Sequence, residues 1–168
     1  MNETRTIRKW FWVWDFEKEE RWLNEMAMNG WILVSVGWCR YTFQRCEPGA
    51  FTLRLEMHPA DDAYIDFLQE TGVICIGRVL QWIYLCKPAE DGPFDLFSDL
   101  DSRIAHLKRI AKMLTAIGVA NLLIGFSNTI NISSLGVINL LAATLLMYGL
   151  GRIHGKIEAL ENDRELRE

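Results

Sequence analysis

The chain has 168 residues, of which 24% are charged, and a formal net charge of -4. This length fits one ordinary domain with an appendage. The acidic balance argues against nucleic acid as a partner, because binding to phosphates requires a basic excess. The charges are unevenly distributed, since no Asp, Glu, Lys or Arg occurs from Met113 to Gly151.

Residues 6–46 predict a βαββ unit. The segment from Thr6 to Trp14 is rich in β-branched and aromatic residues, which favours a strand. Asp15 is a suitable helix cap, the acidic residues after it match the helix dipole, and Asn29-Gly30 ends the helix. Two further strands are expected at 31–37 and 39–46.

Residues 51–87 predict the same order a second time. Residues 51–57 alternate apolar and polar side chains, as a half-buried strand does. Asp61 or Asp62 can cap a helix that closes at Thr71-Gly72. The strands expected after it are 73–79 and 81–86.

The two units together predict an α+β domain over residues 1–90. Two βαββ repeats side by side would form a mixed or antiparallel sheet with helices on one face. The domain is expected to be cytoplasmic, because basic residues flank the charge-free segment 113–151 on both sides.

Residues 91–112 predict a linker followed by an amphipathic stalk helix. Ser98 or Asp99 can cap this helix, in which Leu100, Ile104 and Leu107 share one face. No helix breaker separates it from the apolar segment that follows. An alternative is an interfacial segment in which the apolar residues near Phe97 rest among lipid headgroups.

The charge-free segment 113–151 predicts a transmembrane helical hairpin with spans at 113–129 and 135–151. Each span has about the minimum length for crossing a bilayer. A soluble helix normally has a charged outer face, and neither span has one. Basic residues flank both outer ends, so the positive-inside rule places both termini in the cytoplasm, with 152–168 as a charged tail.

Small and polar residues within the spans predict contacts between the two helices. Small side chains allow close approach, and amides can donate hydrogen bonds across a helix pair. An oligomeric pore or an amide-lined substrate path is the alternative. The residues concerned are Gly118, Asn121, Gly125, Asn128, Gly136 and Asn139.

Seven tryptophans lie in the predicted domain and admit three interpretations. Trp10, Trp12 and Trp14 alternate, so a strand would place them on one sheet face. They could fill the core, sit at a membrane interface, or line an aromatic groove for a flat or cationic ligand with Glu56 as counter-charge. Duplicated units of this kind are similar to the effector-binding domains that resemble the gyrase-inhibitory protein, some of which hold lipophilic cations. The predicted ligand set is Trp10, Trp12, Trp14, Trp38, Glu56 and Trp82.

No catalytic motif and no metal-ligand spacing occurs in the sequence. The four cysteines, Cys39, Cys46, Cys75 and Cys86, form no CxxC pair and are expected to be small buried thiols. We therefore expect a non-enzymatic protein without a cofactor or metal.

Several long segments closely resemble a bacterial family catalogued as domain of unknown function 2812. They are WVWDFEKEERWLNEMAMNGWILVSVGWCRYTF, EPGAFTLRLE, YIDFLQETG and EDGPFDLFSDLDSRIAHLKRI, in this order. The resemblance covers residues 6–110. It implies a membrane-anchored protein of mainly Gram-positive bacteria, often encoded beside PadR-like transcription regulators. It supplies no activity or catalytic residue.

The leading functional hypothesis is a membrane-anchored cytoplasmic sensor or regulatory module. It would bind a small lipophilic ligand or a partner protein, such as the PadR-like regulator. One alternative is a structural or pore-type homo-oligomer assembled through the hairpin. Another is an enzyme acting at the inner face of the membrane.

Overall fold

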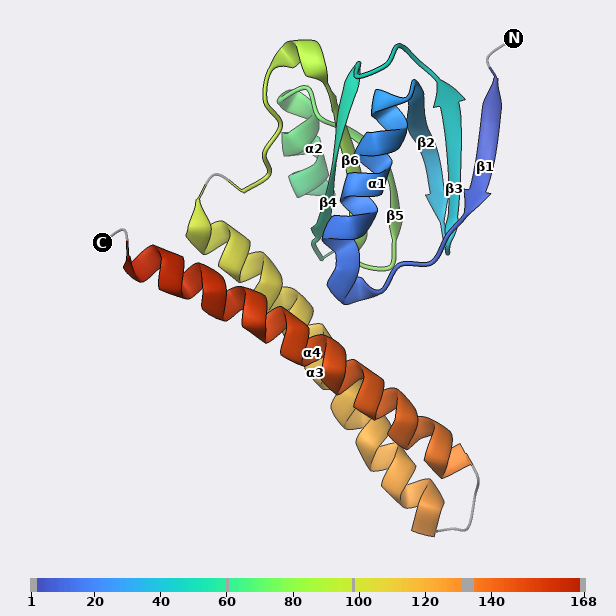
Figure 1. Cartoon of the computed structure of the whole chain (residues 1–168), viewed down its shortest axis with the longest axis vertical. Coiled ribbons are helices and arrows are strands. Elements are labelled where there is room, and N and C mark those ends of the chain that lie inside the picture. The colour runs from blue at the N-terminus through green and yellow to red at the C-terminus, as the bar shows by residue number, and fades with distance from the viewer. Residues whose placement is uncertain (1–2, 60, 98, 131–134, 167–168) are drawn as a thin grey trace. The chain divides into compact units, whose positions relative to one another are not determined.

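The computed structural model describes residues 3–59, 61–97, 99–130 and 135–166, and confirms the α+β class with two βαββ repeats (Figure 1). The chain divides into two compact units, one ending at Leu96 and the other starting at Phe97. The elements of the first repeat are β1 (Thr4–Arg8), α1 (Phe16–Met28), β2 (Trp31–Gly37) and β3 (Arg40–Arg45). Those of the second are β4 (Phe51–Met57), α2 (Asp62–Glu70), β5 (Ile74–Val79) and β6 (Trp82–Pro88), with short 3₁₀ turns at Val13–Asp15 and Ala89–Asp91.

The strands form two separate antiparallel sheets, so the antiparallel alternative is the observed one. Their orders are β1-β3-β2 and β4-β6-β5, each with the last strand of its repeat in the centre (Figure 1). The second strand of each repeat has a register shift, between Leu33 and Ser35 in β2 and between Cys75 and Gly77 in β5. Strands β2 and β5 approach closely at Gly77, where a Cβ atom would lie 3.1 Å from Val36 Cγ1. The matching orders and bulges support a duplicated unit.

The helices cover opposite faces of the second sheet, which corrects the expectation of helices on one face. Tyr84 and Cys86 of β6 belong to the core cluster that includes Leu23 and Ala27 of α1. Ile83 and Leu85 belong to a second cluster with Ile65, Leu68, Val73 and Phe94. Successive residues of a strand point to opposite faces, and four consecutive residues of β6 are buried. Both faces of this central strand therefore need a cover.

Helix α1 takes the place of a neighbouring strand at the free edge of β4. Asn24 Nδ2 donates to the Leu53 carbonyl at 3.0 Å, and the Leu53 amide donates to Asn24 Oδ1 at 2.9 Å. One turn earlier, the Leu55 amide donates to Glu20 Oε2 at 2.9 Å. Unpaired backbone groups that are buried cost about 1–3 kcal/mol each. A helix of the first repeat therefore satisfies backbone groups of the second.

The C-terminal unit is a pair of antiparallel helices of 31 residues each, α3 (Leu100–Ile130) and α4 (Leu135–Glu165). Both are long and apolar enough to cross a membrane. The predicted stalk and first span form one helix, α3. Helix α4 continues through the segment expected to be a charged tail, where Arg164 pairs with Asp101 at 2.9 Å and Glu161 with Lys108 at 2.8 Å. The predicted connection at residues 131–134 lies outside the described residues.

Glycines bring the two helices together at the apolar end of the pair. A Cβ atom on Gly125 would lie 2.9 Å from the side chain of Leu140, and one on Gly118 would lie 2.6 Å from Met147 Cε. Gly136 faces backbone, because its Cβ would lie 2.8 Å from the Thr129 nitrogen and 2.9 Å from the Gly125 oxygen. Backbone cannot rotate away as the end of a methionine can. Gly136 is thus the position least tolerant of a side chain.

We expect Gly136→Ala to lower the stability of the helix pair by about 1–3 kcal/mol, the usual cost of overpacking. The matched control is Gly151→Ala, because nothing lies within 4 Å of a Cβ atom at Gly151. This control should keep or raise stability, since alanine is the better helix former. Thermal unfolding of the full chain in mild detergent measures both. A rise in Tm for both variants would contradict the packing described here.

Candidate functional site

The first strand ends earlier than its sequence suggests, so the prediction of a strand through Trp14 is wrong. Strand β1 stops at Arg8, opposite Arg40 at the start of β3. The last backbone contact with the neighbouring chain segment is the Lys9 amide to the Cys39 carbonyl at 3.1 Å. Beyond this point β3 offers no further residue for pairing, because the chain turns at Trp38-Cys39. The three alternating tryptophans therefore follow the strand instead of lying on it.

Four of the predicted ligand residues form a chain of indole rings. Trp10 makes edge contacts with Trp12 and Trp38, at centroid distances of 5.3 and 6.1 Å. Trp12 stacks on Trp14 at 4.9 Å with an interplanar angle of 6°. The exposed fractions are 67% for Trp38, 53% for Trp10, 39% for Trp12 and 3% for Trp14. Trp10, Trp12 and Trp38 are therefore exposed, and Trp14 is buried.

The other two predicted ligand residues lie in the second repeat. Glu56 is buried on β4 and accepts a hydrogen bond from the Tyr64 hydroxyl at 2.7 Å. Trp82 begins β6 and contacts Phe16 at a centroid distance of 5.3 Å. Glu56 thus has a tyrosine partner within its own repeat.

A carboxylate that the sequence prediction missed joins the two repeats. Glu19, in the first turn of α1, accepts hydrogen bonds at Oε1 from the hydroxyls of Tyr41 at 2.7 Å and Tyr84 at 2.6 Å. Tyr41 comes from β3 and Tyr84 from β6, so each sheet contributes one donor. Glu19 Oε2 has no hydrogen-bond partner within the described ranges. The tyrosine hydroxyls therefore both bind one oxygen of this carboxylate, Oε1.

Burial controls the ionisation of these groups. It raises the pKa of Glu19 above the ordinary value of 4.5, although the hydrogen bonds from Tyr84 and Tyr41 oppose the shift. Burial also raises the pKa of both tyrosines, and the nearby Glu19 charge adds to that shift. Both hydroxyls therefore keep their protons and act as donors.

Phe11 and Trp22 form an aromatic wall next to Tyr41, and the Lys9 ammonium lies against this wall. Trp22 makes an edge contact with Tyr41 at 5.0 Å and a tilted contact with Phe11 at 5.6 Å. The Lys9 ammonium lies 4.4 Å from the Trp22 ring centroid and 4.9 Å from that of Phe11. Such positions are attractive because the face of an aromatic ring is negative. We call Phe11, Glu19, Trp22, Tyr41 and Tyr84 the Glu19 site.

A signal for Glu19 was present in the sequence. Phe16, Leu23 and Ala27 are the buried residues of α1, and Glu19 lies one turn before Leu23 on the same side. The helix dipole is a sufficient explanation for acidic residues in this segment. It therefore gave no reason to assign Glu19 to the buried face of the helix. Asp15 illustrates the same limit, because its side chain makes no cap hydrogen bond and instead pairs with Lys18 at 3.0 Å.

The described residues contain no group of three or more His, Cys, Asp or Glu side chains that could hold a metal ion. The four cysteines are free thiols, and burial raises the pKa of Cys86 to about 11. A thiol with a raised pKa is a weak nucleophile at neutral pH.

The asparagines of the predicted spans lie partly buried in the helix pair. Asn121 Nδ2 donates to the Ile117 carbonyl of its own helix at 2.9 Å. Within the described part of the pair, no amide hydrogen bond from Asn121, Asn128 or Asn139 crosses to the other helix. Close approach at glycines, more than amide bonding, characterises this pairing.

Comparison with known proteins gives a family but no activity. The model of the family described as protein of unknown function DUF2812 matches residues 15–119, and the chain belongs to this family. Neither a curated protein nor a solved structure matches it.

The raised pKa of Glu19 makes stability depend on pH. The folded state binds the Glu19 proton more tightly than the unfolded chain does, so this contribution to stability is full below the unfolded pKa. It is lost as pH rises through the folded pKa. Glu19→Gln keeps an oxygen acceptor for both tyrosines but cannot ionise. We expect its free energy of unfolding to rise relative to the wild type as pH increases from about 4 to 8.

Denaturant unfolding of the full chain in detergent at several pH values measures this difference. Glu25→Gln, at an exposed position on the same helix, is the matched control and should give a flat difference. A difference that moves in favour of the wild type with rising pH would contradict a raised Glu19 pKa.

Proposed function

We propose that this member of the DUF2812 family is a non-enzymatic, membrane-anchored sensor whose N-terminal unit binds a small lipophilic cation at the Glu19 site. The observation that carries the proposal is the Lys9 ammonium on the faces of Trp22 and Phe11, because Trp22 also contacts Tyr41, a hydrogen-bond donor to the Glu19 carboxylate. The chain thus places one of its own cations where a cationic ligand would be recognised.

Lys9 can leave this position without disturbing the sheet. It follows the last residue of β1, and its side chain is exposed. Its ammonium is tethered by a flexible four-carbon chain. A ligand cation with aromatic or aliphatic groups would displace it and gain contacts that the slender lysine chain does not make. The Glu19 carboxylate would balance the charge.

The chemistry of the site favours binding over catalysis. The donors to Glu19 are tyrosines whose raised pKa makes them poor acids. The site as defined contains no Ser, Cys, His or Lys nucleophile. These groups can hold and orient a ligand, which is the role we propose for them.

The α3–α4 pair supplies the membrane anchor in this proposal. Residues 113–151 contain no charged side chain, and basic residues flank them on both sides. This distribution supports insertion in a bacterial cell membrane with both termini in the cytoplasm. Ligand occupancy would then be passed to a partner protein, for which a PadR-like transcription regulator is our candidate.

The test uses the full chain in nanodiscs and tetraphenylphosphonium as the probe cation. We expect saturable quenching of tryptophan fluorescence. Glu19→Gln should weaken binding about tenfold, which corresponds to the loss of one charge-assisted contact. Lys9→Ala should tighten binding by about two- to fivefold, because the competing ammonium is gone.

Glu25→Gln is the control for a lost carboxylate, and neutral triphenylphosphine oxide is the control for a hydrophobic probe without charge. Equal binding by wild type and Glu19→Gln, or equal binding of the neutral probe, would overturn the proposed site.

A second candidate is a homo-oligomeric structural or pore-type assembly formed through the helix pair. An open groove of about 570 Å³ between α3 and α4 favours it, since one lip carries Lys112 and the other Glu158. A second copy related by a two-fold axis would bring these opposite charges together. The mass of the full chain in nanodiscs separates the candidates, because a monomer excludes the assembly.

A further inference from the structure

We infer that one end of the N-terminal unit docks onto the anionic surface of the membrane that anchors the chain. This docking surface, the basic–aromatic end, consists of Arg8, Trp10, Trp12, Trp38 and Arg40. It goes beyond the proposed ligand site and depends only on the α3–α4 pair lying in a bilayer.

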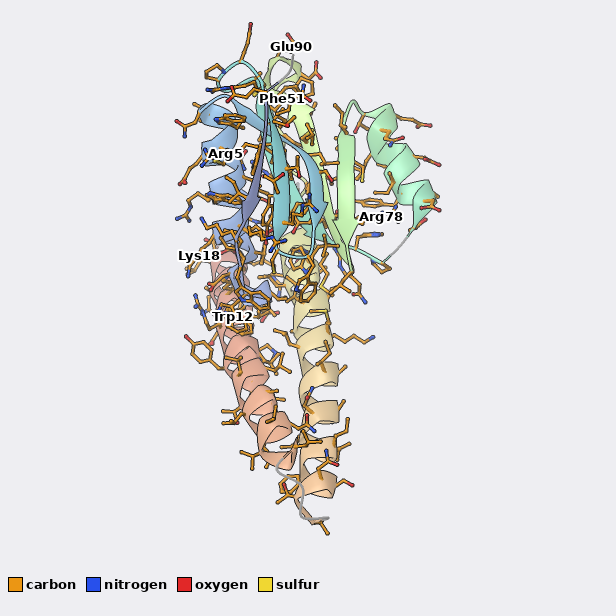
Figure 2. The ribbon with its side chains drawn as sticks, turned by 90° about the vertical axis from the view of Figure 1, so that its right-hand side faces the viewer. Arg5, Trp12, Lys18, Phe51, Arg78 and Glu90 are labelled. Carbon is orange, nitrogen blue, oxygen red and sulfur yellow. The ribbon has the colours of Figure 1, made fainter. Side chains whose placement is uncertain are left out.

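The exposed indoles of this end contact one another and so form one contiguous apolar patch. Trp10 contacts both Trp12 and Trp38, and all three rings are exposed. Figure 1 shows the connection from β1 to α1 passing the turn between β2 and β3, and Figure 2 shows Trp12 at the end of the domain opposite Phe51 and Glu90. Contiguous exposed apolar surface on a soluble domain marks a site of interaction. Indoles in particular favour the membrane–water interface.

Two arginines next to this patch lie directly opposite each other on neighbouring strands, and no ion pair neutralises their charges within the described residues. Arg8 of β1 pairs directly with Arg40 of β3, and both are exposed. Cβ atoms of directly opposed residues lie about 4.5–5.5 Å apart, and like charges at such positions repel. In the part of the chain that the structure describes, neither arginine has a carboxylate partner. An external anion would relieve this repulsion.

The rest of the same sheet face carries no negative charge near this pair. The next row consists of Thr6 and Thr42, whose hydroxyls lie 3.3 Å apart, and β2 adds Ser35. The face is therefore polar and basic, while the adjoining end is aromatic. Arginine attracts anionic headgroups and tryptophan partitions just beneath them, so the combination fits an anionic lipid surface.

Chain connectivity tethers the N-terminal unit to the helix pair. The N-terminal unit ends at Leu96 and α3 begins at Leu100. A tethered domain meets the lipid surface at a high effective concentration, so even a weak docking surface is populated.

The distribution of tryptophan makes a direct test possible. All seven tryptophans lie between residues 10 and 82, and none lies in α3 or α4. We would reconstitute the full chain in nanodiscs of phosphatidylcholine and phosphatidylglycerol in equal parts, with bromine on the phosphatidylcholine acyl chains. Bromine quenches only tryptophans close to the acyl region. We expect quenching relative to unbrominated discs, and its loss at high salt.

The variants separate docking from misfolding. Arg8→Gln/Arg40→Gln keeps every tryptophan and should shift the docking equilibrium about 30-fold toward the undocked state, abolishing most of the quenching. Arg21→Gln/Lys87→Gln removes the same charge elsewhere and should leave the quenching unchanged. Trp10→Phe/Trp38→Phe should remove most of the quenchable fraction and leave the part that belongs to Trp12, whereas Trp31→Phe, at a buried position, should keep all of it.

Three outcomes would overturn the inference. They are the absence of bromine quenching in the wild type, equal quenching in discs of phosphatidylcholine alone, and unchanged quenching in Arg8→Gln/Arg40→Gln. The first would point to a protein partner for this surface instead of a lipid. A chain that fails to enter nanodiscs would instead refute the membrane anchor, and tetraphenylphosphonium binding is measured independently of all these outcomes.

Discussion

The N-terminal unit depends on the way α1 completes the edge of β4. A strand edge carries a row of unpaired backbone groups and normally requires another strand or a cover. Here Asn24 supplies both a donor and an acceptor to Leu53, and Glu20 accepts from Leu55. Side chains spaced four residues apart on a helix thereby reproduce part of a strand's hydrogen bonding. This fixes the rotation of α1 against the second repeat.

The position of the Glu19 site follows from this fixed rotation. Once Glu20 and Asn24 face β4, the neighbouring Glu19 is directed between β3 and β6. Tyr41 and Tyr84 there share its Oε1 atom. The carboxylate consequently links both sheets and the helix, so that a ligand at its second oxygen would be sensed by both repeats. Lys9 lies between Arg8 and Trp10, so the segment that covers the aromatic wall is continuous with the docking surface.

The sequence predicted the order of the elements well and their partnerships poorly. The repeat was visible because each helix has a cap or acidic start and ends at a glycine before an apolar strand. The extent of β1 was not visible, because a strand ends where its partner does and the partner lies far along the chain. The four consecutive apolar residues Ile83–Cys86 indicate a strand that is covered on both faces. The alternation of apolar and polar residues in 51–57 instead suggested strands that are buried on one face only. Glu19 was missed because the helix dipole was a sufficient explanation for an acidic first turn.

The measurement that tests the role of α1 most directly is residue-resolved amide hydrogen exchange at Leu53 and Leu55. The account predicts that both amides are protected in the wild type. It also predicts that Asn24→Ala speeds exchange at Leu53 by about tenfold or more, because its acceptor is removed. Asn29→Ala, at the exposed end of the same helix, is the matched control and should change neither amide. Rapid exchange at Leu53 and Leu55 in the wild type, or protection unaffected by Asn24→Ala, would contradict the account.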